Sequence, residues 1–217
     1  MADIFHEVDD EVRRERLQRL WERYSLYIIL VAVLIVAGIG AWRGYEWYVA
    51  KHAAAAGAKF EAAVTLAEQG KHTQAQAAFA KLAGEAPAGY RMLSRLRAAA
   101  ALVPTKPEEA AKAYDTLAAD ASLGRTVQDL AAVRAAMLSV DSAPFAEMQQ
   151  KLAPVAEAGR PFRHNARELL ALSAWRNHDL TNARKYIDMV TSDPESPPNV
   201  RGFVQILSAL ITAAGKN

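Results

Sequence analysis

Residues 63–82 read AVTLAEQGKHTQAQAAFAKL. The second half of this stretch contains four apolar residues with the spacing i, i+3, i+4, i+7: Ala75, Ala78, Phe79 and Leu82. The first half contains three with the spacing i, i+3, i+4: Ala63, Leu66 and Ala67. Each spacing describes one face of an α-helix, and the polar residues 70–73 interrupt the periodicity. The stretch therefore predicts two helices joined by a short turn.

Both patterns return three more times along the chain. The four-residue pattern recurs as Ala110, Ala113, Tyr114, Leu117, then as a weaker copy with one polar position, Phe145, Met148, Gln149, Leu152, and then as Ala183, Tyr186, Ile187, Val190. The three-residue pattern recurs as Ala98, Ala101, Leu102, as Val133, Ala136, Met137, and as Ala171, Ala174, Trp175. A helix pair that recurs about every 35 residues is typical of tetratricopeptide repeats. Because one pair cannot bury its apolar face alone, we expect the pairs to stack into a solenoid.

Polar breaks with helix-start residues separate the two helices of each pair: 70–73, 105–107, 141–144 and 178–181. Threonine or aspartate is expected to cap the second helix, and proline is expected in its first turn.

A last helix over 199–213 has one apolar face (Val200, Phe203, Val204, Leu207, Leu210, Ile211) and one polar face (Arg201, Gln205, Ser208, Thr212). This amphipathic pattern predicts a C-terminal capping helix for a repeat domain that covers residues 53–217.

An uncharged stretch precedes the repeats, YSLYIILVAVLIVAGIGAW at 24–42. A helix of this length spans about 28 Å, close to the hydrocarbon thickness of a bilayer. Tyrosine and tryptophan lie at both ends, where headgroups favour them. A buried core helix is one alternative, although such helices rarely run this long without a charge. A cleaved signal peptide is another, but the apolar run is longer than such peptides use and no cleavage site follows. We therefore predict an uncleaved transmembrane anchor at 24–42, followed by a linker helix at 43–52.

The distribution of basic residues predicts the orientation of this anchor. Five arginines precede it (Arg13, Arg14, Arg16, Arg19, Arg23) and three basic residues follow it (Arg43, Lys51, Lys59). Because basic residues favour the cytoplasmic side, residues 1–23 are expected to be a short cytoplasmic segment. The repeat domain is then expected in the periplasm of a Gram-negative host.

Small residues at Ala37, Gly40, Ala41 and Gly44 form a stripe on the anchor, a candidate face for contact with another membrane helix.

Composition and motifs argue against several classes of function. The net charge is +2, with 26 basic and 24 acidic residues, so no excess field favours nucleic acid. Cysteine is absent, and the histidines are scattered at positions 6, 52, 72, 164 and 178 without metal-ligand spacing. No phosphate-binding loop, dinucleotide fingerprint or nucleophile elbow is present. We therefore expect no catalytic residues, no cofactor, no metal and no small-molecule substrate.

The chain as a whole resembles a known family. The N-terminal acidic and arginine-rich segment, an anchor ending in Gly40-Ala41-Trp42-Arg43, the stretch KFEAAVTLAEQGK at 59–71 and the degenerate repeats are similar to those of the ancillary Sec-translocon subunits, the YfgM-like tetratricopeptide proteins of Gram-negative bacteria. This resemblance implies an inner-membrane protein that associates with Sec translocon subunits and a membrane-anchored periplasmic prolyl isomerase, and that assists exported polypeptides.

Three functions remain open from the sequence. The leading one is a non-enzymatic scaffold or chaperone-like adaptor that presents a helical surface to protein segments. The alternative is a coordinator of envelope assembly or cell division that also acts by protein–protein binding. An enzyme remains only if distant residues converge without a motif.

Overall fold

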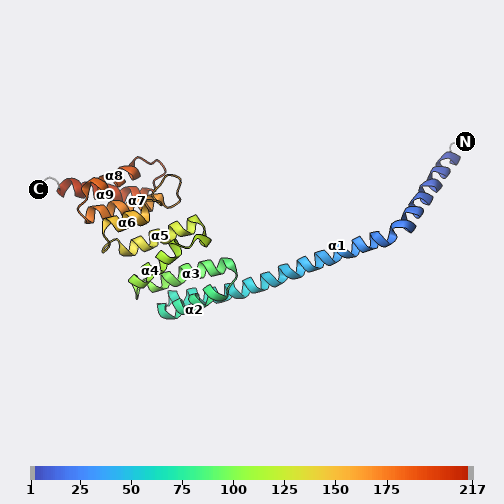
Figure 1. Ribbon diagram of the computed structural model, residues 1–217, viewed down its shortest axis with the longest axis horizontal. Coiled ribbons are helices and arrows are strands. Elements are labelled where there is room, and N and C mark those ends of the chain that lie inside the picture. The colour runs from blue at the N-terminus through green and yellow to red at the C-terminus, as the bar shows by residue number, and fades with distance from the viewer. Residues whose placement is uncertain (1–2, 215–217) are drawn as a thin grey trace. The chain divides into compact units, whose positions relative to one another are not determined.

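The structure is a computed structural model that describes the backbone of residues 3–214 and the side chains of residues 21–213. Within that range the regular elements are helices, and no strand is present among the described residues (Figure 1). The chain divides into two compact units, one that ends at Ala54 and one that begins at Ala55. The fold is therefore all-α, as predicted. The predicted boundary after residue 52 and the other segment limits stay predictions.

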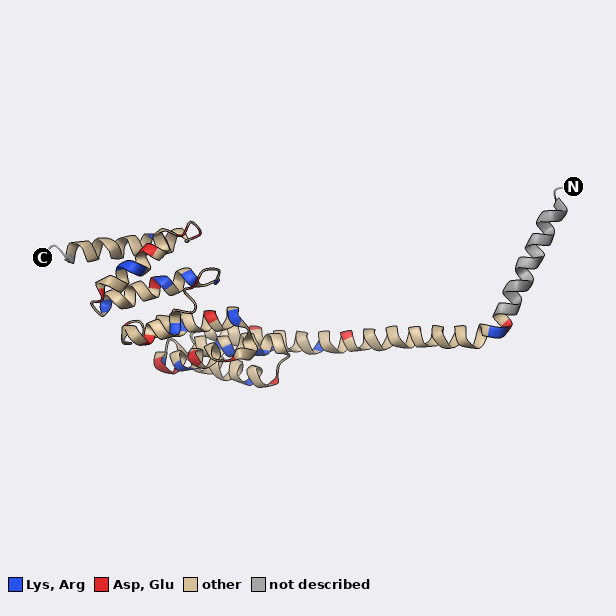
Figure 2. Ribbon diagram, turned by 45° about the horizontal axis from the view of Figure 1, so that its top comes forward, with Lys and Arg blue, Asp and Glu red and all other residues tan. Residues whose placement is uncertain are grey.

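The first unit consists of α1 (Asp3–Glu68) as far as Ala54. From Trp21 onward this helix is long and apolar enough to cross a membrane, and its most apolar window, with a mean hydropathy of 2.4, has none of its residues buried. Figure 2 shows the corresponding part of α1 as a long stretch without charged residues. The predicted anchor and linker lie within this one helix, with no break between them. The side chains of residues 1–20, including four of the arginines used to predict orientation, lie outside the described range.

The second unit contains the end of α1 and eight further helices. Their bounds are α2 (His72–Glu85), α3 (Ala88–Leu102), α4 (Pro107–Ala118), α5 (Arg125–Ser139), α6 (Phe145–Leu152), α7 (Arg163–Arg176), α8 (Leu180–Thr191) and α9 (Pro198–Ala214), with a short 3-10 helix η1 (Ala121–Leu123) before α5. From α2 on, each α-helix packs against the next, and α7 also contacts α5 and α9. This succession of stacked helices is the predicted solenoid.

The predicted four-residue patterns form the cores of the helix pairs. Three patterns are buried or nearly so over their full length, and in the weaker copy Met148 and Leu152 are fully buried while Gln149 is half-buried. In the three-residue patterns the small residues face the neighbouring helix, and Ala63, Ala136 and Ala174 have no exposed surface. Alanine at these positions lets two helix backbones approach closely, which is why the periodicity identifies the interface correctly.

Met137 corrects the prediction for the third pair. It shares its spacing with buried Val133 and Ala136, but half of its surface (50%) is exposed. The reason is its place on α5, where it lies at the border between the packed face and the solvent face of the helix. An i, i+3, i+4 pattern identifies the apolar side of a helix, but it does not show which of those residues the neighbouring helix covers.

The turns between paired helices confirm some of the predicted start signals. Pro107 occupies the first turn of α4, and the side chain of Asp179 accepts a hydrogen bond from the backbone N–H of Asn182 at the start of α8. The predicted threonine caps are wrong. Because α2 already begins at His72, Thr73 lies inside the helix, and the Thr105 hydroxyl donates to the carbonyl of Leu102 instead.

Two of these turns share one backbone geometry. Gly70 has φ of 74°, its N–H donates to the carbonyl of Ala67, and the next N–H donates to the carbonyl of Leu66. His178, at the equivalent place after α7, has φ of 60° with the same two hydrogen bonds, to Trp175 and Ala174. Both residues close their helix in the left-handed conformation, which glycine adopts without steric cost and histidine does not.

α9 covers the end of the solenoid with one face. Val200, Val204, Leu207 and Ile211 are buried against α7 and α8. The predicted burial of Leu210 is wrong, because 48% of its surface is exposed, and Ile206 beside it is 65% exposed. The outer face of this helix is therefore less polar than the capping pattern predicts, since these two residues lie among Gln205, Ser208 and Thr212.

Candidate functional site

The predicted membrane-helix contact face, Ala37, Gly40, Ala41 and Gly44, is exposed on α1. At Gly40 and Gly44 a Cβ atom would have no atom within 4 Å. The stripe is therefore open, and its role as a contact face stays a prediction.

No candidate metal centre is formed by the residues whose side chains are described. Within 21–213, no three histidine or carboxylate side chains come together in a group that could hold a metal ion.

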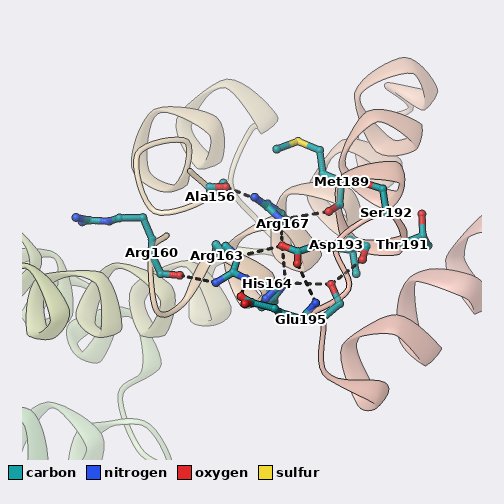
Figure 3. A network of polar contacts seen from close by, with 12 residues as sticks. Ala156, Arg160, Arg163, His164, Arg167, Met189, Thr191, Ser192, Asp193 and Glu195 are labelled. Carbon is teal, nitrogen blue, oxygen red and sulfur yellow. Dashed lines mark hydrogen bonds and ion pairs between the residues drawn. The ribbon is translucent and has the colours of Figure 1, made fainter. Parts of the chain in front are cut away.

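The most extensive polar network joins α7 to the loop between α8 and α9 (Figure 3). Asp193 is at its centre and accepts hydrogen bonds from Arg163 Nε at 3.0 Å and from Arg167 Nη1 at 2.9 Å. Arg163 also pairs with Glu195. Hydrogen bonds from Arg163, and further bonds from the Glu195 backbone and Arg167, hold the pKa of Asp193 well below its usual range. Asp193 is therefore ionised at neutral pH and fixes the loop to α7.

Arg167 ties a second irregular segment to the same helix. Its side chain is 7% exposed, and its guanidinium donates to the carbonyl of Ala156 at 2.9 Å and to that of Met189 at 3.2 Å. A buried arginine requires such partners, because an unpaired buried charge is strongly unfavourable. The network thus holds the end of the third helix pair and the end of the fourth against α7.

The network also contains a serine, a histidine and an aspartate, but their geometry is not that of a nucleophilic triad. Both Ser196 Oγ (3.0 Å) and Asp193 Oδ2 (3.8 Å) lie nearest to the same nitrogen of His164, Nδ1. A triad needs its serine and its acid on opposite nitrogens. In addition, Ser196 Oγ donates to the carbonyl of Val190 at 2.6 Å, and burial, followed by the charge of Arg163, lowers the pKa of His164. These residues are structural.

A groove between α3 and α5 combines apolar and basic side chains on an open surface. It has a volume of about 730 Å³. One wall comes from α3 and the turn after it (Leu93, Leu96, Arg97, Ala100, Val103, Pro104), and the other comes from α5 (Leu130, Arg134, Met137, Leu138). Tyr114 of α4 also lines the groove. Leu93 and Met137 are 44% and 50% exposed, so each wall presents a large apolar side chain to solvent.

The alanines of α3 and α5 explain where the groove forms. Ala99, Ala131 and Ala135 are buried with Tyr114 and Leu117 of α4 in one small core. Because the three alanines have short side chains, α3 and α5 both pack closely against α4. Leu93, Arg97 and Ala100 lie at i, i+4 and i+7 of α3, so they share a face of that helix. On α5, Leu130, Arg134 and Met137 have the same spacing and therefore share a face of that helix.

The groove is basic as well as apolar. Arg97 and Arg134 are both exposed, no acidic residue lines the groove, and neither arginine forms an ion pair within the described side chains. Burial raises the pKa of Tyr114, while the positive charges of Arg134 and Arg97 oppose this shift. Both arginines therefore act on the same hydroxyl. Tyr114 is only 5% exposed, and its hydroxyl has no hydrogen-bond partner among residues 21–213.

The sequence did not indicate this groove. Tyr114 and Met137 were predicted to fill helix interfaces, and neither Arg97 nor Arg134 belongs to a recognisable motif. An arginine lies next to the apolar three-residue pattern in both the second and the third helix pair, at 97 and 134. In the 35-residue register, however, Arg97 corresponds to Ala132 and Arg134 to Ala99, so the repeat spacing does not predict that the two side chains line one groove.

Comparison with curated proteins and with solved structures finds no significant match. A family model described as a tetratricopeptide repeat-like domain matches residues 18–184. This range extends from the beginning of the apolar part of α1 into α8, and therefore covers most of the helix pairs described above. The chain belongs to this family of tetratricopeptide repeat-like proteins.

Proposed function

We propose that this protein is a membrane-anchored, non-enzymatic scaffold or chaperone-like adaptor whose repeat domain binds segments of other proteins. Tetratricopeptide-like domains are in general protein-interaction modules, since stacked helix pairs provide an extended surface. The observation that carries the proposal is the groove between α3 and α5. Its exposed leucine and methionine, and two arginines that form no ion pair within the described side chains, are features of a surface that receives a peptide.

The proposal places the apolar part of α1 across the inner membrane. Support comes from the length and hydropathy of this helix and from aromatic residues at both ends of the uncharged stretch. The excess of arginine before the stretch favours a cytoplasmic N-terminus and a periplasmic repeat domain. In this arrangement the stripe Ala37, Gly40, Ala41, Gly44 faces lipid or a neighbouring membrane helix.

We further propose that the partners are Sec translocon subunits, a membrane-anchored periplasmic prolyl isomerase and newly exported polypeptides. The support is the full-length resemblance to the ancillary translocon subunits. A scaffold at the exit of the translocon needs a surface that accepts many sequences, and an apolar groove with exposed walls meets that need.

Affinity capture from detergent-solubilised membranes tests this proposal. The full chain is compared with Leu93→Ser/Met137→Ser, in which the apolar walls become polar, and with Ala80→Ser/Ala119→Ser as an exposed control pair. We expect translocon subunits or the isomerase with the full chain and the control, and clearly less with the groove variant. Recovery of cell-division or envelope-assembly proteins instead supports the alternative coordinator function. Equal recovery with the groove variant contradicts the role of the groove.

A further inference from the structure

The arginines of the α3–α5 groove differ from most other arginines of the repeat domain. Five of the other arginines form ion pairs with acids: Arg95 with Asp120, Arg160 with Asp129, Arg163 and Arg167 with Asp193, and Arg176 with Asp141. These arginines have a structural role that is already filled. Arg97 and Arg134 have no such acid within the described side chains, although both are placed beside a cavity.

Tyr114 adds a polar group to the lining of the groove. Its ring is largely buried, whereas its hydroxyl remains accessible to solvent and has no hydrogen-bond partner among residues 21–213. A ligand oxygen near Arg97 and Arg134 would accept the hydrogen of this hydroxyl, and the two guanidinium groups favour a negatively charged oxygen there.

The walls of the groove specify the rest of the ligand. Leu93, Leu96, Met137 and Leu138 line it together with aliphatic parts of α3 and α5. Methionine adapts its shape to different apolar side chains, which suits a surface that accepts varied sequences. A free inorganic anion would leave these walls in contact with water. The same groove therefore offers sites for apolar side chains next to a site for carboxylates.

We propose that the groove binds acidic segments of partner proteins in which carboxylate side chains alternate with large apolar ones. The apolar side chains contact Leu93 and Met137. Carboxylates of the same segment accept hydrogen bonds from Arg97, Arg134 and the Tyr114 hydroxyl. This inference rests on the proposed function and adds to it the chemical class of the bound segment.

Fluorescence anisotropy of labelled ten-residue peptides tests the proposal with the full chain in a nonionic detergent. The peptides alternate Leu with Glu, Leu with Gln, or Ser with Glu, and empty micelles give the baseline. We expect the Leu–Glu peptide to bind at least about tenfold more tightly than either of the others, equivalent to about 1.4 kcal/mol. Its affinity should also fall as salt is raised from 50 to 300 mM, because salt screens exposed charges.

Two double variants with the same change in charge separate the groove from a general charge effect. Arg97→Gln/Arg134→Gln removes the groove arginines, and Lys112→Gln/Arg184→Gln removes two exposed basic residues of α4 and α8 that have no ion pair within the described side chains. The first should weaken Leu–Glu binding by at least about tenfold, and the second by less than about twofold. Circular dichroism verifies that both variants retain the helical content of the native chain.

Several results would overturn the proposal. Equal affinity for the Leu–Glu and Leu–Gln peptides rejects acid recognition but leaves peptide binding, and thus the proposed function, intact. Equal losses in the two double variants reject the groove as the acidic-segment site. Displacement of the Leu–Glu peptide by phosphatidylglycerol vesicles, but not by phosphatidylcholine vesicles, assigns the arginines to an anionic lipid. Concentration-dependent dimers that dissociate in Arg97→Gln/Arg134→Gln assign them to a second copy of the chain.

Discussion

Phe79→Ala tests whether the solenoid is stabilised pair by pair. The Phe79 ring is 1% exposed and belongs to a small core with Ala63, Ala75 and Ala101. It also contacts the ring of Phe60 edge-on, with 5.3 Å between centroids and 63° between planes. Because the buried residues around the ring are alanines, the cavity can shrink only by movement of the partly buried Phe60, Val64 and Leu66. We therefore expect a loss of about 4 kcal/mol, within the range of about 3–5 kcal/mol for buried phenylalanine.

The location of this loss is as informative as its size. The core around Phe79 is separate from the large core formed by residues of α5 to α9. In a solenoid each pair contacts only its neighbours, so destabilisation should decrease with distance along the stack. A loss of about 4 kcal/mol lowers amide protection about a thousandfold, since each 1.4 kcal/mol corresponds to a factor of about ten.

Native-state hydrogen exchange of the full chain in detergent measures both quantities. Amides of α2 should lose about a thousandfold protection, and amides of α8 less than about tenfold. Phe79→Leu, which retains an apolar side chain, should lose less than about 1.5 kcal/mol. Leu93→Ala, at an exposed position, should change stability by less than about 1 kcal/mol. A loss below about tenfold in α2, or an equal loss in α8, would refute the division into separately stabilised pairs.

Four further predictions test other parts of the structure. Asp193→Asn should lower the melting temperature at pH 7. Because the pKa of Asp193 is depressed in the folded chain, the native protein should lose the stabilisation provided by the ionised carboxylate as pH falls below about 4. The variant should therefore show a weaker pH dependence in thermal unfolding by circular dichroism. His178→Gly should raise stability by up to about 1 kcal/mol in the same assay, because glycine relieves the left-handed strain, and an unchanged or lower melting temperature would contradict that turn geometry. Ser142→Cys in this cysteine-free chain should react with a membrane-impermeant maleimide in intact spheroplasts, whereas labelling only after lysis would reverse the proposed orientation. Gly40→Leu/Ala41→Leu should reduce co-purification of a membrane partner without affecting insertion, and full recovery would show that the stripe is not a contact face.

Helical periodicity predicted the core because the same spacing recurs in four pairs. In the pattern Ala183, Tyr186, Ile187 and Val190, all four residues are buried, and the same holds for most members of the others. The apolar stretch of α1 was recognisable for a similar reason, since length and hydropathy suffice to identify it. These features depend on local sequence, which is available without the fold.

Other features depend on which helices meet, and the local pattern could not predict them. Met137 and Leu210 fit the apolar spacing, yet both are exposed because the neighbouring helix covers only part of that arc. Arg97 and Arg134 gain their importance only when α3 and α5 are both held on α4. The network around Asp193 joins residues 26 to 32 positions apart, and no motif relates them.

Photo-crosslinking in living cells tests most directly whether the α3–α5 groove binds partner proteins. A photoreactive phenylalanine analogue is placed at Met137 in the groove, at Lys112 on exposed α4 as a control, and at Ile206 on the outer face of α9. We expect protein adducts from position 137 that are lost when Arg97→Gln/Arg134→Gln is introduced, and no adducts from position 112. Adducts from position 206 together with none from position 137 would contradict this expectation and would assign partner binding to α9.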